Sequence, residues 1–570
     1  MNKLKIRYII FVFAGLTVFS CDESKWLTEK PLDFYAPENS YETSANFKQS
    51  VNYMFVVLRN WHFQFDGDLY NWPLFIANDC FVHGFPWGYD LGFNMYKSAI
   101  VASTGYVQKN WTMFYNVVAN ANIILEKLET NASLVSAADK KTFRGEALFF
   151  RAYYHRLLAH IWGDVPLITE MLTSPRRDFT RTPRAEVYEQ CRVDLEEAIG
   201  LLADIDKVAD GAISKQVAQH LLAEVYISLG NYAKAIEAAS AVINHPAMGL
   251  MTERFGTLKS QPGDVYYDLF RGGNQNRSKG NREGLLVLQY DFNSGSPIPC
   301  NLTRFYIPQL RNAQVRHKNG TWTTPFTDFT REGGGRGMGY FTPTAYMTYK
   351  IWESDKDNDI RYSNHNYFHD WRIDNPNAAA HGEWIIAGNH ANPAPDLGLG
   401  SCMLYPIFNK FCALEAYPDN SYQLKDGVRD LTALGHQILV NVGNSAIGSF
   451  KDEYLIRLAE TYLLRAEAYV KSNQNNLAAD DINVIRKRAN AKPASASEMS
   501  MDYILDERAR ELGGEEARTI TLFRMGLYLE RVKKYNPAAY NTGDWQYQWP
   551  IPHSEIEKNT EAELTQNKGY

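Results

Sequence analysis

Hydrophobic side chains recur at helical spacing on both sides of a break at Gly230-Asn231. These positions are Leu221, Leu222, Val225 and Leu229 before the break, and Tyr232, Ala235, Ile236 and Ala239 after it. A repeat of three to four residues marks one face of an α-helix, and a Gly-Asn pair ends a helix. Residues 218–243 are therefore predicted to form a helical hairpin.

A related pattern occupies residues 458–488, and weaker helical units lie at 111–128 and 143–161. Its small and apolar positions are Ala459, Tyr462, Ala466 and Ala468, then, after Asn475-Asn476, Ala479, Ile482 and Ile485. Small residues let paired helices approach closely, as in the tetratricopeptide repeat that both hairpins resemble. Because a single hairpin cannot bury its apolar face, such units stack. The sequence predicts a mostly α scaffold over approximately residues 40–250 and 451–535.

The helical period fades between about residues 251 and 450, where Gly, Pro, Asn and aromatic residues become frequent. The apolar run at 285–290 is the clearest strand in this region. We expect a long, loop-rich, ligand-binding insertion that carries short strands and interrupts the helical scaffold. Residues 536–570 are expected to form a separate C-terminal segment.

The chain begins with basic Lys3, Lys5 and Arg7, an apolar run at residues 8–19, and then Cys21. This run is too short to span a bilayer and has the order of a secretory signal peptide. The sequence 18–21, Val-Phe-Ser-Cys, resembles a lipoprotein box. We therefore predict that residues 1–20 are removed and that Cys21 becomes a lipid anchor. An ordinary cleavage site in a secreted protein without lipid is the alternative.

Charge and cysteine usage exclude several classes of protein. The formal net charge is −6, and residues 1–20 hold three basic and no acidic residues, so their removal leaves −9. An acidic chain without a basic cluster disfavours nucleic acid as a partner. The cysteines other than Cys21 are odd in number and contain no Cys-x-x-Cys pair, which argues against a disulfide framework and against zinc or redox chemistry. These five are Cys80, Cys191, Cys300, Cys402 and Cys412.

A series of charged motifs follows residue 456. It runs through Arg457, Arg465-Ala466-Glu467-Ala468, Arg486-Lys487-Arg488, Asp506-Glu507-Arg508-Ala509-Arg510-Glu511-Leu512, Arg518 and Leu522-Phe523-Arg524-Met525-Gly526, and the chain closes on Trp549-Pro550-Ile551-Pro552 and Gln566-Asn567-Lys568-Gly569-Tyr570. This order closely resembles the C-terminal half of the SusD/RagB family of bacterial nutrient-binding outer-membrane lipoproteins. Weaker matches are Asn274, Asn276 and Glu283 before the predicted strand, Asp359-Ile360-Arg361, and Tyr405-Pro406 before Lys410-Phe411.

The resemblance implies a protein that binds an oligosaccharide and hands it to a SusC-like TonB-dependent transporter, with no enzymatic activity. It also implies an outer-membrane location, and Asp22 and Glu23 directly after Cys21 resemble a signal for display on the cell exterior. The family's ligand contacts come from loops in the N-terminal half and the central insertion. Those loops vary with the ligand, so the resemblance does not fix particular residues.

Aromatic and polar residues concentrate in the first ninety positions, in a segment interrupted by Gly and Pro. They are Trp61, Trp72, Trp87 and Tyr89 together with Asp66, Asp68, Asn78 and Asp79. Aromatic rings stack on the apolar faces of sugars, and Asp and Asn side chains bind hydroxyl groups. We therefore predict ligand contacts here, with Trp322, Trp371, Trp384 and Arg336 as further candidates in the insertion.

Burial between helices is the alternative for each tryptophan, because tryptophan is usually largely buried. Trp87 is the preferred exception. It lies in Phe85-Pro86-Trp87-Gly88-Tyr89, where Pro and Gly favour an exposed turn, and an aromatic residue on a loop tip is typical of recognition.

Other patterns give weak signals for a metal, phosphate or catalytic site, and no cofactor is predicted. The glycine-rich residues 332–339 lack the strand and helix of a phosphate loop and are interpreted as a flexible loop. Asp355, Asp357 and Asp359 alternate as the first calcium ligands of an EF-hand do, but the residues that follow do not match that loop. A different kind of calcium site and a solvated acidic turn are the two remaining interpretations. His365 and His369 lack a convincing helix for a metal site, and no motif places two carboxylates around one glycosidic bond.

Three functions remain open at this point. Oligosaccharide capture is the leading hypothesis, and peptide capture by a RagB-like protein is the second, because a tetratricopeptide groove can hold an extended peptide. The third is an envelope adaptor that binds no nutrient. Clustered exposed Trp with Asp or Asn would favour sugar, whereas a long groove with backbone edges would favour peptide.

Overall fold

The computed structural model describes residues 40–63, 72–84, 96–294, 299–326, 329–368, 370–386, 402–412, 414, 417–432, 435–440, 449–536 and 542–570. Its α-helices are α3 Ser44–Phe63, α4 Trp72–Phe75, α5 Tyr96–Ala99, α6 Gly105–Thr130, α7 Ala137–Trp162, α8 Arg184–Leu201, α9 Lys215–Ser228, α10 Tyr232–Ile243, α11 Val265–Leu269, α12 Leu302–Tyr306, α13 Ala345–Thr348, α14 Leu458–Lys471, α15 Asn475–Arg488, α16 Met501–Leu512, α17 Arg518–Met525, α18 Tyr528–Tyr535 and α19 His553–Lys558.

The strands are short and pair two at a time. They are β1 Phe81–His83, β2 Gly284–Leu288, β3 Val315–Arg316, β4 Trp322–Thr323, β5 Phe341–Pro343, β6 Tyr367–Phe368, β7 Asp370–Arg372, β8 Trp384–Ile386, β9 Ile407–Phe408, β10 Leu424–Lys425, β11 Val428–Arg429 and β12 Glu453–Arg457. The predicted mostly α fold with short strands is confirmed. In the described part of the chain, no helix has an apolar stretch long enough to cross a membrane.

Both predicted helical hairpins are present. Helices α9 and α10 form the first, and Gly230 adopts a φ of 74° between them, a left-handed conformation that glycine tolerates best. The side chain of Asn231 then caps α10 by accepting a hydrogen bond from the backbone N–H of Lys234 at 3.3 Å. Helices α14 and α15 form the second hairpin, whose break falls at residues 472–474, just before the predicted position.

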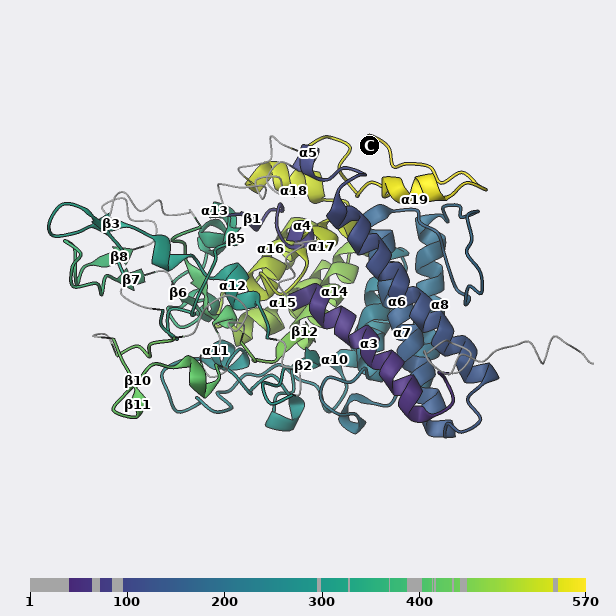
Figure 1. Ribbon diagram of the computed structural model, residues 1–570, viewed down its shortest axis with the longest axis horizontal. Coiled ribbons are helices and arrows are strands. Elements are labelled where there is room, and N and C mark those ends of the chain that lie inside the picture. The colour runs from purple at the N-terminus through teal and green to yellow at the C-terminus, as the bar shows by residue number, and fades with distance from the viewer. Residues whose placement is uncertain are drawn as a thin grey trace, which may run out of the picture.

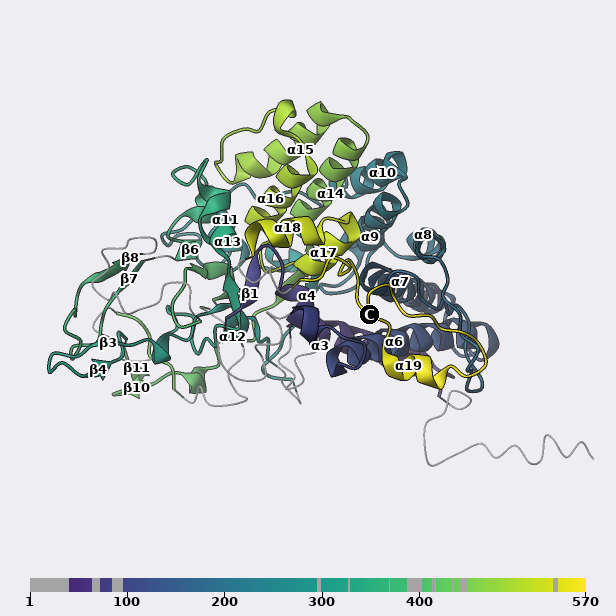
Figure 2. The same cartoon turned by 90° about the horizontal axis from the view of Figure 1, so that it is seen from above.

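The long helices pack in a continuous row in which α6 contacts α7, α7 contacts α8, α8 contacts α9, and α9 contacts α10. Helix α10 then packs directly against α14, although more than two hundred residues separate them in the sequence. The segment between them leaves this row, and its strands β3, β4, β7, β8, β10 and β11 lie at the opposite end of the molecule from α6 and α8 (Figures 1 and 2).

Two strand pairs and the C-terminal segment tie distant parts of the chain together. Strand β2 pairs antiparallel with β12, and β1 pairs antiparallel with β5. The C-terminal segment passes close to α7, where the indole N–H of Trp162 donates to the carbonyl of Pro550 at 2.9 Å. Trp549 meets the Trp162 ring edge to face, with centroids 5.7 Å apart, so the closing Trp-Pro motif is part of the core.

Many charged residues of the C-terminal motifs form a buried ion-pair network around Glu511 of α16. The Glu511 carboxylate accepts from Arg361 at 2.9 Å, from Arg457 at 2.5 Å and from Arg488. Glu283 and Glu507 extend this network by binding the same arginines, with Arg457 to Glu283 at 3.0 Å and Arg361 to Glu507 at 2.8 Å. Burial alone would raise the pKa of Glu511, but the three guanidinium groups hold it well below its usual range.

Candidate functional site

A cavity of about 550 Å³ lies within the insertion, a size typical of small-ligand sites. Its wall combines aromatic rings with hydrogen-bonding side chains. The aromatic members are Phe326, Phe329, Phe368, Trp371 and Trp384, and the polar or charged members are Arg311, Thr324, Thr330, Glu332, Arg372, Asp374, Gln423 and His436.

The β7–β8 pair positions the two tryptophans of this cavity. The register places Arg372 opposite Trp384, so both leave the same face of the sheet, while Trp371 leaves the other face. Trp384 is 53% exposed and Trp371 only 3%. The Trp371 ring lies edge to face against Phe368 at 5.5 Å, yet its buried indole N–H has no acceptor within the described part of the chain. A ligand in the cavity therefore meets one open aromatic surface, the ring of Trp384.

The opposite wall is held by backbone pairing between residues 329–331 and 437–439. Glu332 accepts from the backbone N–H of Gln437 at 2.8 Å and from Arg331 at 2.6 Å, which fixes its carboxylate. Arg311 lies over the Phe329 ring, 5.8 Å from its centroid. Burial, and then the charge of Arg336, lower the pKa of the Arg311 guanidinium from its ordinary value.

The glycine-rich residues 332–339 form part of this wall, and the prediction of a flexible loop is wrong. A Cβ on Gly337 would lie 2.3 Å from the Ile307 carbonyl oxygen and 2.4 Å from that of Pro308. The loop is therefore packed against backbone, where only glycine fits. Arg336 is half-buried and is not among the residues that line the cavity.

The structure brings Trp371 and Trp384 together in the cavity, but it separates Trp322 from them. Trp322 lies on the β3–β4 hairpin, 45% exposed, with the guanidinium of Arg316 over its ring at 4.0 Å. Sequence reasoning missed Phe326, Phe329 and the other residues of the second wall, because they come from loops with no local motif.

Four of the predicted N-terminal contacts are wrong, because their side chains are buried. Trp61 is 0% exposed and donates to Asn110 at 2.7 Å. Trp72 is 1% exposed within a cluster of aromatic rings. Asn78 is also fully buried, and its side-chain oxygen accepts from two backbone N–H groups that follow it.

Asp79, the fourth of these residues, is a buried partner of two arginines. Its carboxylate accepts from Arg518 at 2.8 Å and from Arg531 at 3.0 Å. Burial raises its pKa, but the two guanidinium groups outweigh burial and lower the pKa to about 2. Asp79 therefore joins the N-terminal region to α17 and α18 and has no surface to offer a ligand.

Several predicted residues lie outside the described residues: Cys21, Asp66, Asp68, Trp87, Tyr89 and His369. Their proposed roles stay predictions. Of the candidate calcium ligands, Asp359 binds Arg361 at 2.7 Å and Asp355 binds Arg486 at 3.2 Å, so both carboxylates already face a cation. Within the described ranges, no group of three or more His, Cys, Asp or Glu side chains is arranged to hold a metal ion.

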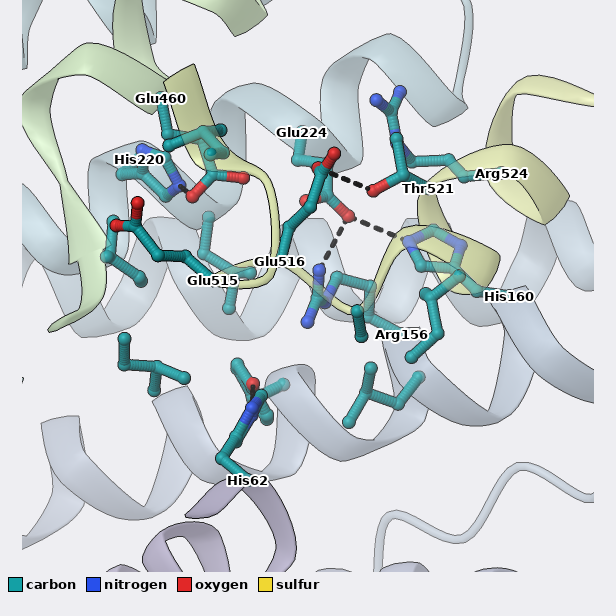
Figure 3. Close-up of a pocket in the computed structure, with 18 of the residues that line it drawn as sticks. His62, Arg156, His160, His220, Glu224, Glu460, Glu515, Glu516, Thr521 and Arg524 are labelled. Atoms are coloured by element: carbon teal, nitrogen blue, oxygen red, sulfur yellow. Dashed lines mark hydrogen bonds and ion pairs between the residues drawn. The ribbon is translucent and has the colours of Figure 1, made fainter. Parts of the chain in front are cut away.

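A second, polar cavity lies between α7, α9 and the C-terminal helices (Figure 3). Its volume is about 90 Å³, well below the size of a typical small-ligand site. Glu224 accepts from Arg156 at 2.6 Å and from His160 at 2.8 Å, so the carboxylate at its centre already has two partners in the protein. Burial lowers the pKa of His160 to about 3 despite the opposing effect of Glu224. This cavity is part of the polar core rather than a candidate site.

Comparison with known families agrees with this architecture. Residues 286–570 match the family described as the SusD family, and residues 25–227 match the family described as "Starch-binding associating with outer membrane". The first of these matches covers half of the chain. The chain belongs to the SusD family.

Two SusD-like proteins of Formosa agariphila are similar to this chain in sequence. SusD-like protein P25 is 24% identical over 599 residues, which cover 100% of both chains. SusD-like protein P2 is 27% identical over 299 residues, which cover 51% of this chain and 53% of that protein. The chain therefore aligns with about half the length of the second relative.

Among solved structures, a laminarin-binding SusD-like protein superimposes with a TM-score of 0.64. The superposition covers 93% of this chain and 100% of that protein at 22% sequence identity. At this identity the likeness establishes the SusD-like fold and leaves ligand contacts to be argued from the residues of this chain.

Proposed function

We propose that this chain is a surface-exposed lipoprotein that binds an oligosaccharide and delivers it to a SusC-like TonB-dependent outer-membrane transporter. Membership of the SusD family supports this function, and so does a structural relative described as laminarin-binding. The cavity in the insertion is the proposed glycan site.

The observation that carries the proposal is the combination of Trp371 and Trp384 with polar side chains in one cavity. The exposed ring of Trp384 offers a flat apolar surface to the C–H face of a sugar. The buried ring of Trp371 forms part of the wall of the same cavity. Arg372 leaves the sheet beside Trp384 and supplies further donors at the cavity wall.

Membership of a family of binding proteins supports binding without catalysis. A glycosidase needs two carboxyl groups across one glycosidic bond, one of them free to exchange a proton. Glu332 is held by an ion pair with Arg331 and by the Gln437 amide, which suits a fixed hydrogen-bond acceptor. The protein is proposed to capture and release its ligand chemically unchanged.

The membrane attachment is proposed to be the lipid on Cys21, with the protein facing the cell exterior. The basic residues and short apolar run before this cysteine support it. Replacing Cys21 by Ala should move the protein from the membrane fraction to the soluble fraction, because the lipid is its proposed anchor. Equal membrane retention of the variant in cells without the transporter would contradict the anchor.

Calorimetric titration of residues 22–570 with laminarin, soluble starch, a fructan and a host-type glycan tests the ligand class. Trp384→Ala should weaken binding of the accepted glycan by about 1–3 kcal/mol, as for other aromatic hot spots. Tyr547→Ala is the matched control, because Tyr547 is a similarly exposed aromatic residue, 51% exposed, in the C-terminal segment. Binding of peptides but of no glycan would replace this proposal with RagB-like peptide capture, and binding of neither would favour an adaptor.

A further inference from the structure

Two arginine side chains line the insertion cavity, one on each of its walls. Arg372 lies on β7 directly across from Trp384 on β8, and both side chains leave the same face of this strand pair. Arg311 belongs to the other wall, beside the ring of Phe329. Both arginines are exposed, so their guanidinium groups are open to a ligand that enters the cavity.

The partners of these two guanidinium groups carry no negative charge. The Nε–H of Arg372 donates to the backbone carbonyl oxygen of Gly382 at 3.1 Å, and Arg311 lies over the neutral ring of Phe329. Within the described part of the chain, neither arginine forms an ion pair. Each guanidinium group therefore keeps an uncompensated charge and further N–H donors for a ligand.

The carboxylates of the cavity wall do not neutralise these two cations. Glu332 pairs instead with Arg331 at 2.6 Å and accepts from a backbone N–H at 2.8 Å. Asp374, the other acidic residue of the wall, is only 8% exposed. The acidic side chains of this cavity are thus held by the protein, whereas its two arginines are exposed.

Further arginines beside the cavity add positive charge near Arg311. Arg336 lies between Gly335 and Gly337, which both line the cavity. Burial, and then the charge of Arg336, lower the pKa of Arg311. Burial also lowers the pKa of Arg304, and the charges of Arg336 and Arg311 act in the same direction. These three like charges are close enough to repel one another, and an anion beside Arg311 would relieve that repulsion.

We infer that the insertion cavity selects glycans whose sugar rings carry an anionic group, either a carboxylate or a sulfate ester. The inference rests on the proposed glycan function of this cavity. A sugar ring that stacks on Trp384 directs its equatorial substituents sideways, past the edge of the indole. Arg372 lies at that edge, because directly opposite residues of an antiparallel pair have Cβ atoms about 5 Å apart.

The guanidinium group of Arg372 can donate two parallel hydrogen bonds to a carboxylate or sulfate in this position. Arg311 supplies a second positive charge from the other wall of the cavity. A neutral glycan would gain the stacking contact with Trp384 but would leave both cations without a counter-charge. The cavity therefore distinguishes acidic from neutral glycans through these two arginines.

Calorimetric titration of residues 22–570 with matched pairs of oligosaccharides tests this selectivity. The first pair is an oligogalacturonide and its methyl ester, which has the same sugar rings without the charge. The second pair is sulfated laminarin and laminarin. In at least one pair the acidic member should bind about ten-fold more tightly or better, the order expected of a hydrogen bond between charged groups. The pair that shows the preference identifies the anionic group, and added NaCl should reduce that preference.

Substitutions at the two arginines locate the effect. Arg372→Met and Arg311→Met should each remove most of the preference for the acidic member, and Arg372→Lys, which keeps the charge but not the fork, should retain part of it. Arg316→Met is the matched control, because Arg316 is an exposed arginine of the same insertion that does not line the cavity. Like the cavity arginines, it donates to a backbone carbonyl, at 3.3 Å, and lies over an aromatic ring, at 4.0 Å.

Because both arginines are exposed, the variants should fold, and circular dichroism checks this. Equal or weaker binding of the acidic members overturns the inference, and the proposed glycan function stands if a neutral member binds. A preference that survives both Arg372→Met and Arg311→Met as well as it survives Arg316→Met overturns the inference too. Binding of no oligosaccharide in either pair also overturns it, and titration with starch and a fructan then decides the proposed glycan function separately.

Discussion

At the centre of the scaffold, the Glu511 carboxylate is surrounded by Arg361, Arg457 and Arg488, all of them buried. In the insertion cavity, by contrast, Trp384 is 53% exposed and the buried N–H of Trp371 has no acceptor among the described residues. Both regions gather polar and aromatic side chains. The difference lies in exposure, because the charged groups of the first region face one another inside the protein, whereas the second region leaves the ring of Trp384 open to a ligand.

The largest effect on stability is expected at the buried ion-pair network around Glu511. Glu511→Ala should destabilise the fold by about 3–5 kcal/mol, because it removes the carboxylate that three buried guanidinium groups share and leaves them only partly neutralised. Denaturant unfolding followed by circular dichroism measures this change. Glu237→Ala is the control, since Glu237 pairs with Lys234 on the exposed face of α10 and should contribute about 1 kcal/mol or less. Equal effects of both variants would contradict the structural importance of the network around Glu511.

Acid should weaken the scaffold through its buried histidines. Burial lowers the pKa of His62, His160 and His220 to about 3, whereas the pKa of an unfolded histidine is about 6.5. Between these values the unfolded chain binds more protons, so the free energy of unfolding should fall as pH drops from about 6.5 towards 3. Burial raises the pKa of Glu146 and Glu453 to about 7, and these two groups act in the opposite direction.

Denaturant midpoints of the parent protein at pH 7.0 and 5.0 test this balance, and the midpoint should be lower at pH 5.0. His160→Gln should reduce the difference between the two midpoints, because glutamine does not titrate. A parent midpoint that is unchanged or higher at pH 5.0 would show that the histidines do not dominate.

A moderate effect is expected at the contact between helices of the scaffold. Ala235 is 1% exposed in α10, which packs against both α9 and α14. Ala235→Trp should overpack this contact and destabilise the protein by about 1–3 kcal/mol, while the affinity of the folded fraction for its glycan stays the same. Thermal unfolding and calorimetry report the two quantities separately. An unchanged melting curve would mean that α10 accommodates a large side chain and does not pack as tightly as a tetratricopeptide-like unit requires.

The helices were predictable because their signal is local. The helical spacing of apolar residues around Leu221 and Ala235 identified the hairpin, and Gly230 indicated its turn. The ion-pair network was visible only as a series of charges: the order of Arg457, Arg488 and Glu511 indicated the family, but their convergence required the fold.

The site was less predictable because aromatic composition does not distinguish a core from a binding surface. Trp61 and Trp72 are covered by helices and rings far from them in the sequence, while Trp384 is left open at the end of a two-stranded sheet. Asp79 gave the same difficulty, because Arg518 and Arg531, its partners, lie more than four hundred residues away. A residue's neighbours in sequence give no information about such contacts.

The smallest effect is expected at Trp322, an exposed tryptophan outside the cavity wall. Its ring is 45% exposed and contacts the guanidinium of Arg316, an exposed cation–π pair worth about 0.5–1 kcal/mol. Trp322→Ala should therefore change stability by no more than this amount and glycan affinity by less than about two-fold, in contrast to Trp384→Ala. Parallel calorimetry of the two variants makes the comparison. If Trp322→Ala weakened binding as much as Trp384→Ala, the ligand surface would extend to the β3–β4 hairpin, and the cavity would be only part of it.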